Sequence, residues 1–272
     1  MSIMDSHKTQ SNEIILEWDG TLFPTWNILH EKCASLRESD AYIEGRDTLY
    51  YYSINDVPRV HSTNIRRLER SVIDLLETCI DVGLRPTILT GASKEWIERC
   101  LERYYTNLRT FITANKIRIL SARSWIDRKD QFLVDLSALS STAFPKLKSL
   151  AIRSILFWSL ATKERANVIV VGISQRDIDA LCHVHVHNAG IQGKELNCLG
   201  LGIKSIQGLT ALRDQLEHLT DDIPAIVAQM TKSSANNFET HKIPSVVRVV
   251  PPPTANDKRV NFRSPVIYRR RA

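Results

Sequence analysis

Two acidic residues at the end of one apolar run constrain the fold of this chain more than any other feature. The nine residues from Ile14 to Leu22 read Ile-Ile-Leu-Glu-Trp-Asp-Gly-Thr-Leu. The apolar start of this segment predicts a buried strand over residues 13–18, so Glu17 and Asp19 come at the carboxyl end of that strand. Open α/β sheets bind their ligands at the carboxyl ends of their strands. We therefore expect a polar site at this position.

Segments of strand and helix character alternate along the rest of the chain. Further strands are predicted at residues 85–90, 116–121, 168–171 and 196–201, of which 168–171 is apolar throughout, as a buried parallel strand should be. Apolar residues at helical spacing occur over residues 64–80, after the capping residue Ser93, after Pro145, and from Leu209 to Leu219. Strands that alternate with helices form a parallel sheet with helices on both faces. The pattern predicts a three-layer α/β sandwich.

Composition divides the chain into three parts. Residues 1–12 are polar, lack the apolar core of a signal peptide and predict a flexible N-terminus. Residues 13–231 predict one α/β domain, in which residues 34–62 form at most a small cap. Residues 232–272 are rich in Ser, Asn, Pro and Arg, and the run Pro251–Pro253 forbids regular structure. We expect this tail to be disordered.

The basic excess of the chain lies in the tail. The formal net charge is +6, but residues 232–272 hold nine Lys and Arg against two Asp and Glu. The preceding 231 residues hold 27 basic against 28 acidic residues. A neutral domain argues against a nucleic-acid-binding face on the folded part. The tail has the charge to bind phosphates, membranes or acidic partners.

The cysteines and the hydropathy favour the inside of a cell. The five cysteines are odd in number and scattered through apolar or helical segments, which is typical of reduced thiols. No apolar run in the sequence is long enough to cross a bilayer. We expect an intracellular, cytoplasmic protein.

The motif that begins at Glu17 resembles the first motif of the haloacid dehalogenase-like (HAD) superfamily, the aspartate-nucleophile phosphotransferases. The superfamily pattern is Asp-x-Asp-Gly-Thr-Leu, and the resemblance extends over roughly residues 13–220. It implies that Glu17 stands at the position of the nucleophile, Asp19 at that of the general acid/base, and Thr90 at that of the phosphate-binding residue. It also implies that Lys148 offsets the phosphoryl charge. Glu17, Asp19 and Asp177 would hold Mg²⁺.

Short sequence segments relate the chain to one subgroup of the superfamily. They are Trp18 in the first motif, the run Leu22-Phe23-Pro24-Thr25, Trp96, and the run Ser121-Ala122-Arg123. All are similar to a poorly characterised subgroup of the superfamily that is found in protists. The chain resembles a divergent member of that type.

Two positions depart from the superfamily pattern and bear on activity. Glu17 replaces the nucleophilic aspartate and carries its carboxylate one methylene farther out, and a displacement of about 1 Å can cost roughly a hundredfold in rate. In the fourth motif, Gly-Asp-x-x-x-Asp, Ile173 replaces the first acid and only Asp177 remains. An isoleucine offers no oxygen to Mg²⁺. Both changes indicate a degenerate active site.

These departures favour a non-catalytic pseudophosphatase, an interaction or structural protein without a cofactor. In such a protein, Asp19, Thr21 and Lys148 stabilise the turn after the first strand through hydrogen bonds and an ion pair with Glu17. The alternative is a Mg²⁺-dependent phosphoric monoester hydrolase. In that case Glu17 is an unusual nucleophile, or Asp19 acts with an activated water.

The tail contains a candidate docking motif. Residues Lys258 to Phe262 read Lys-Arg-Val-Asn-Phe, and Arg259, Val260 and Phe262 resemble the Arg-Val-x-Phe word of regulators of type-1 protein phosphatase. Such a segment binds in extended form, with the two apolar side chains in alternate pockets. The alternatives are that the tail binds another acidic surface, a nucleic acid, or nothing specific.

Overall fold

A computed structural model of the chain describes residues 10–25, 59–122, 143–161, 163, 165–172, 195–202, 208–232 and 248–250. Six strands form one sheet in the order β3-β2-β1-β4-β5-β6. Five of them are parallel: β1 (Gln10–Glu17), β2 (Arg85–Thr90), β3 (Arg118–Ser121), β4 (Arg165–Gly172) and β5 (Glu195–Gly202). The sixth, β6 (Arg248–Val250), pairs antiparallel with β5.

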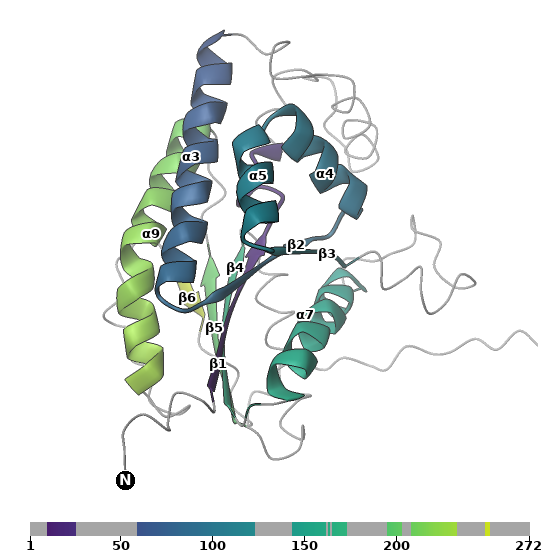
Figure 1. The fold of residues 1–272 in the computed structure, drawn as a ribbon, viewed down its shortest axis with the longest axis vertical. Coiled ribbons are helices and arrows are strands. Elements are labelled where there is room, and N and C mark those ends of the chain that lie inside the picture. Colours follow the sequence, from purple (N-terminus) through teal and green to yellow (C-terminus); the bar gives the residue numbers. More distant parts are fainter. Residues whose placement is uncertain are drawn as a thin grey trace, which may run out of the picture.

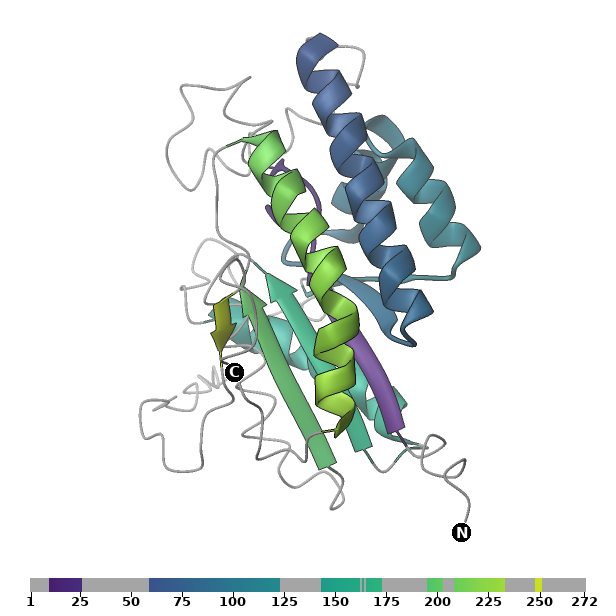
Figure 2. The same ribbon diagram turned by 90° about the vertical axis from the view of Figure 1, so that its left-hand side faces the viewer.

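Helices cover both faces of this sheet, which confirms the predicted three-layer α/β sandwich. One layer contains α3 (Arg59–Asp81), α4 (Lys94–Arg103), α5 (Thr106–Ala114) and α9 (Leu209–Lys232). The opposite face packs against α7 (Ala143–Ala161). Figure 1 shows α7 on the other side of the sheet from α3 and α9, and Figure 2 shows α9 lying along the strands.

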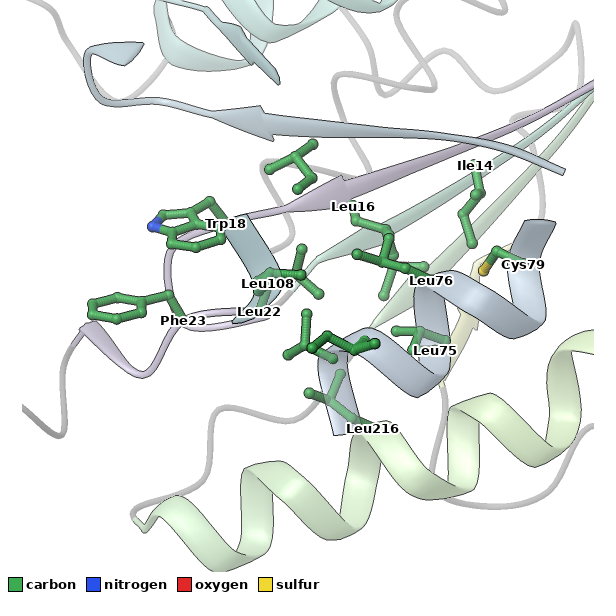
Figure 3. Close-up of a cluster of buried hydrophobic side chains, with 14 of the residues drawn as sticks. Ile14, Leu16, Trp18, Leu22, Phe23, Leu75, Leu76, Cys79, Leu108 and Leu216 are labelled. Carbon is green, nitrogen blue, oxygen red and sulfur yellow. The ribbon is translucent and has the colours of Figure 1, made fainter. Parts of the chain in front are cut away.

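The alternation of side chains along β1 separates the two cores. Ile14, Leu16 and Trp18 join the core beneath α3 and α9, as Figure 3 shows, whereas Ile15 joins the core beneath α7. Because successive side chains of a strand point to opposite faces, Glu17 lies on the same face as Ile15. The position of Glu17 opposite α7 is therefore set by the apolar run before it.

The structure corrects three boundaries predicted from the sequence. β1 begins at Gln10, inside the segment expected to be flexible, because the polar residue Asn12 accepts a hydrogen bond from Asn167 of β4. Residues 59–62, expected in the cap, form the first turn of α3, while residues 34–58 lie outside the described residues. Residues 248–250 of the expected disordered tail form β6, since the β-branched pair Val249 and Val250 suits a strand.

The sequence did not predict α5, and the reason is a tertiary cap. Its N-cap position, Tyr105, makes no side-chain cap hydrogen bond. The buried Glu69 of α3 supplies the missing acceptor: its Oε1 accepts from the backbone N–H groups of Asn107 and Leu108 at 2.7 and 2.9 Å. A carboxylate at a helix N-terminus also interacts favourably with the helix dipole. No local sequence signal marks this start.

The described part of the chain has no helix that could span a membrane. Its three cysteines, Cys79, Cys100 and Cys198, are free and buried. Burial raises the pKa of the Cys79 thiol to about 12. Cys33 and Cys182 lie outside the described residues.

Two helices end in the same backbone motif with different residues. After α3, Leu84 N–H bonds to the Cys79 carbonyl and Gly83 N–H to that of Ile80, with Gly83 at φ +81°. After α5, the corresponding left-handed position is Lys116, at φ +53°. Glycine adopts this conformation freely, whereas a side chain makes it costly.

We expect Lys116→Gly to raise the free energy of unfolding by about 0.5–1 kcal/mol, because it removes this conformational strain. The matched change Gly83→Ala should lower it by about 1 kcal/mol. A Cβ at Gly83 meets no atom within 4 Å, so the loss comes from the backbone alone. Urea unfolding measures both effects. A destabilised Lys116→Gly variant would contradict this account.

Candidate functional site at the carboxyl end of the sheet

Four of the predicted site residues converge at one end of the sheet. Glu17 ends β1, Asp19 follows it, Thr90 ends β2, and Lys148 lies near the start of α7. All four are buried. The convergence follows from the parallel pairing of β1 with β2, which places their carboxyl ends side by side. Asp177 and Ile173 lie outside the described residues.

A tight turn after β1 holds Asp19 in place. The carbonyl of Trp18 accepts hydrogen bonds from the backbone N–H groups of Leu22 and Phe23 at 3.1 and 2.9 Å. Gly20 donates to the Phe23 carbonyl at 2.8 Å and has φ +76°. This left-handed conformation is the reason that the turn needs glycine after the second acid.

The carboxylate of Asp19 accepts hydrogen bonds from three side chains. Its Oδ1 accepts from the Thr25 hydroxyl at 2.9 Å and from the Trp96 indole N–H at 3.0 Å. Its Oδ2 accepts from the Thr90 hydroxyl at 2.9 Å. Thr90 has one hydroxyl proton, which this bond uses, and its oxygen accepts from Ala92 N–H at 2.9 Å. Asp19 is thus hydrogen-bonded to β2 and α4.

Glu17 and Lys148 form a buried ion pair, as the sequence predicted. Lys148 Nζ lies 2.7 Å from Glu17 Oε2, with side-chain exposures of 10% and 8%. Such a pair needs close geometry to offset its desolvation. Ile15, Leu89 and Ile152 pack beside it, and the void between these residues is too small for a water molecule.

A second carboxylate of β1 contacts the other end of α7. Glu13, two residues before Ile15 on the same face, accepts a hydrogen bond from the Ser159 hydroxyl at 2.6 Å. It also pairs with Arg85 and Arg118. Glu13 and Glu17 therefore attach α7 to β1 at both ends. The Glu17–Lys148 pair has this docking role whether or not the site is catalytic.

The side chain of Thr21 does not fulfil its predicted role. We expected its hydroxyl to stabilise the turn, but Thr21 Oγ1 is buried without a hydrogen-bond partner among the described residues. Only the backbone N–H of Thr21 bonds within the turn, to the Trp18 carbonyl at 3.3 Å. Threonine at this position contributes through its buried volume.

Sequence reasoning missed the roles of Trp96 and Thr25. Trp96 was one of several apolar residues at helical spacing, and that spacing explains its burial but not its N–H group. Thr25 belonged to the run Leu22-Phe23-Pro24-Thr25, which was used only for the resemblance to the protist subgroup. The available signal was chemical: a buried indole N–H or hydroxyl usually has an acceptor, and Asp19 is the nearby carboxylate.

The side chains of the described residues do not by themselves form a Mg²⁺ site. The ion requires several hard oxygen ligands in near-octahedral geometry. Glu17 points one carboxylate oxygen at Lys148, and both oxygens of Asp19 accept from protein donors. Within the described residues, no three His, Cys, Asp or Glu side chains are grouped so that they could hold a metal. Asp177, which the superfamily resemblance also assigns to Mg²⁺, lies outside the described residues.

The sequence matches no family model, and no curated protein is similar to it. Among solved structures, the HAD domain of the effector protein Lem4 from Legionella pneumophila is similar to this chain, with 13% sequence identity and a TM-score of 0.37. The similarity covers 70% of this chain and 86% of that domain. At these values, the description of the fold rests on the strand order and register given above.

The Asp19 hydrogen bonds can be tested with two tryptophans. Trp96→Phe removes the N–H that Asp19 accepts and should lower the free energy of unfolding by about 1.5–3 kcal/mol beyond the loss of ring volume. Trp18→Phe is the matched control, because Trp18 is equally buried and its N–H has no partner among the described residues. Chemical unfolding compares the two. Equal losses would contradict the role of the Trp96 hydrogen bond.

Proposed function

We propose that the folded domain is a non-catalytic, HAD-like pseudophosphatase that acts through binding rather than phosphoryl transfer. The observation that carries this proposal is the Asp19 carboxylate, which accepts from Thr25, Thr90 and Trp96. A general acid/base must reach the leaving group of its substrate. Both Asp19 oxygens already accept from buried protein donors, and a movement of the carboxylate toward a leaving group would cost about 1–3 kcal/mol for each donor that it leaves unpaired.

The contacts of Thr90 and Glu17 also support this proposal. The hydroxyl proton that would bind a phosphoryl oxygen is donated to Asp19. Glu17 carries its carboxylate farther from the strand than an aspartate would. Its bond to Lys148 joins β1 to α7. The polar residues at the end of the sheet thus have structural partners of their own.

A Mg²⁺-dependent phosphatase is the second candidate, and one observation favours it. Glu17, Asp19, Thr90 and Lys148 lie at the same end of the sheet, with Lys148 Nζ 2.7 Å from Glu17 Oε2. This candidate predicts Mg²⁺ binding that calorimetry detects. It also predicts that Glu17→Asp strongly raises turnover, because the shorter side chain restores the geometry of attack.

Phosphatase assays distinguish the two candidates. With p-nitrophenyl phosphate or phosphopeptides and Mg²⁺, we expect the full chain to release no more phosphate than Glu17→Gln does. The double variant Glu17→Asp with Ile173→Asp is the matched control for a decayed site, because it restores both carboxylates. Robust Mg²⁺-dependent turnover of the wild type that Glu17→Gln abolishes would overturn the proposal.

We further propose that the basic tail is the partner-binding segment and that Arg259, Val260 and Phe262 dock on a protein, with type-1 protein phosphatase as the candidate. The support is the sequence pattern, since these residues lie outside the described part of the chain. An extended segment of this kind uses its apolar side chains for specificity and its basic residues for attraction.

In a pull-down with the purified catalytic subunit, Val260→Ala with Phe262→Ala should abolish binding. Arg269→Ala with Arg270→Ala should weaken it only in a salt-dependent way, because these residues contribute charge alone. If the Arg pair matters and the Val–Phe pair does not, the tail binds by charge without a docking motif. Strongly salt-dependent binding to nucleic acid would then be the expected behaviour.

A further inference from the structure

The outer face of α3 carries two opposite charges in separate halves. Its first twelve residues include four exposed arginines, Arg59, Arg66, Arg67 and Arg70. Its last eight residues include three acidic residues that lie wholly or partly in solvent, Asp74, Glu77 and Asp81. The near-zero net charge of the domain conceals this separation, because the two halves cancel.

This arrangement opposes the electrostatics of the helix itself. A helix N-terminus carries partial positive charge and its C-terminus partial negative charge, so acids at the start and bases at the end stabilise it. Helix α3 has no acidic residue in its first turn and no basic residue in its last turn. Helix stability therefore does not explain why the arginines precede the acids.

Contacts within the domain do not explain it either. Between described residues, the face has one ion pair, Arg70–Asp74 at 2.8 Å, between side chains that are 70% and 43% exposed. Exposed pairs of this kind contribute little. Among the described residues, Arg66, Arg67 and Glu77 form no ion pair. Figure 1 shows α3 beside α9, and the charged residues lie on the part of α3 that this packing leaves exposed.

The pattern also restricts what can bind there. A nucleic acid or an anionic membrane lying along α3 would gain from the arginines but be repelled by Asp74, Glu77 and Asp81. A partner that suits both halves must carry acids opposite the arginines and bases opposite the acids. A second copy of α3 in antiparallel orientation has this pattern, because a two-fold axis places the same patch on both partners.

We propose that the outer face of α3 pairs with the same face of a second copy of this chain. The axis passes near the middle of the helix, so that Arg67 and Arg70 of one copy approach Glu77 and Asp74 of the other. The face lacks the apolar centre of a tight interface, so the dimer is weak and depends on ionic strength. This inference is independent of whether the site at the end of the sheet is catalytic.

Sedimentation equilibrium of the full chain and two charge-reversed variants tests the pairing. We expect the wild type to self-associate at about 20 mM salt, with an association constant that falls at least about tenfold at about 300 mM. Arg67→Glu with Arg70→Glu should lower the constant about tenfold at low salt, and so should Asp74→Arg with Glu77→Arg. An equimolar mixture of the two variants should associate again, because each presents the charge that the other lost.

The control carries the same change of net charge as the variant with the two reversed arginines, at residues outside α3. Arg109→Glu with Arg153→Glu alters exposed residues of α5 and α7 and should associate like the wild type. Far-ultraviolet circular dichroism verifies that each variant is folded. A wild type that stays monomeric at low salt overturns the proposal. Equal weakening in the control, or reversed variants that do not associate when mixed, also overturns it.

Discussion

The carboxylate of Asp19 is the interaction on which the carboxyl end of the sheet depends. It joins the turn after β1 to β2 through Thr90 and to α4 through Trp96. A buried carboxylate without donors is very costly, so the turn, the strand end and the helix must all be in place together. The aromatic cluster around Phe23 forms on the same framework, with Trp96 at 6.2 Å and Trp18 at 5.3 Å between ring centroids.

Much of the fold could be predicted because the central strands β1, β2 and β4 are largely buried on both faces. The strand segments predicted from the sequence agree with the five parallel strands within a few residues, and the order of strands and helices indicated the sandwich. The predictions failed where contacts between residues far apart in the sequence determine where an element begins. α5 begins where Glu69, far away in the sequence, caps it. β1 extends into polar sequence because Asn167 bonds to Asn12.

For the site, too, the positions of residues could be predicted from the sequence, whereas their hydrogen-bond partners could not. That Glu17, Asp19 and Thr90 converge could be expected, because strand ends of a parallel sheet meet at one edge. Lys148 lies on α7, and only the superfamily resemblance suggested its place beside them. Which donors bind Asp19 could not be predicted. The apolar spacing indicates that Trp96 is buried, but it does not indicate which acceptor its indole N–H binds. The role expected for Thr21 was wrong, because a polar side chain in a turn need not find a hydrogen-bond partner there. Its hydroxyl is polar, but the turn directs it into the protein, where no described residue accepts it.

The network around Asp19 also bears on the stability of the domain. Here the donors come from Thr25, Thr90 and Trp96, so the carboxylate is satisfied within the protein alone. Such a network stabilises the domain without any ligand. If the proposed pseudophosphatase function holds, the stability that these hydrogen bonds give is a reason for Asp19, Thr25, Thr90 and Trp96 to be present without catalysis.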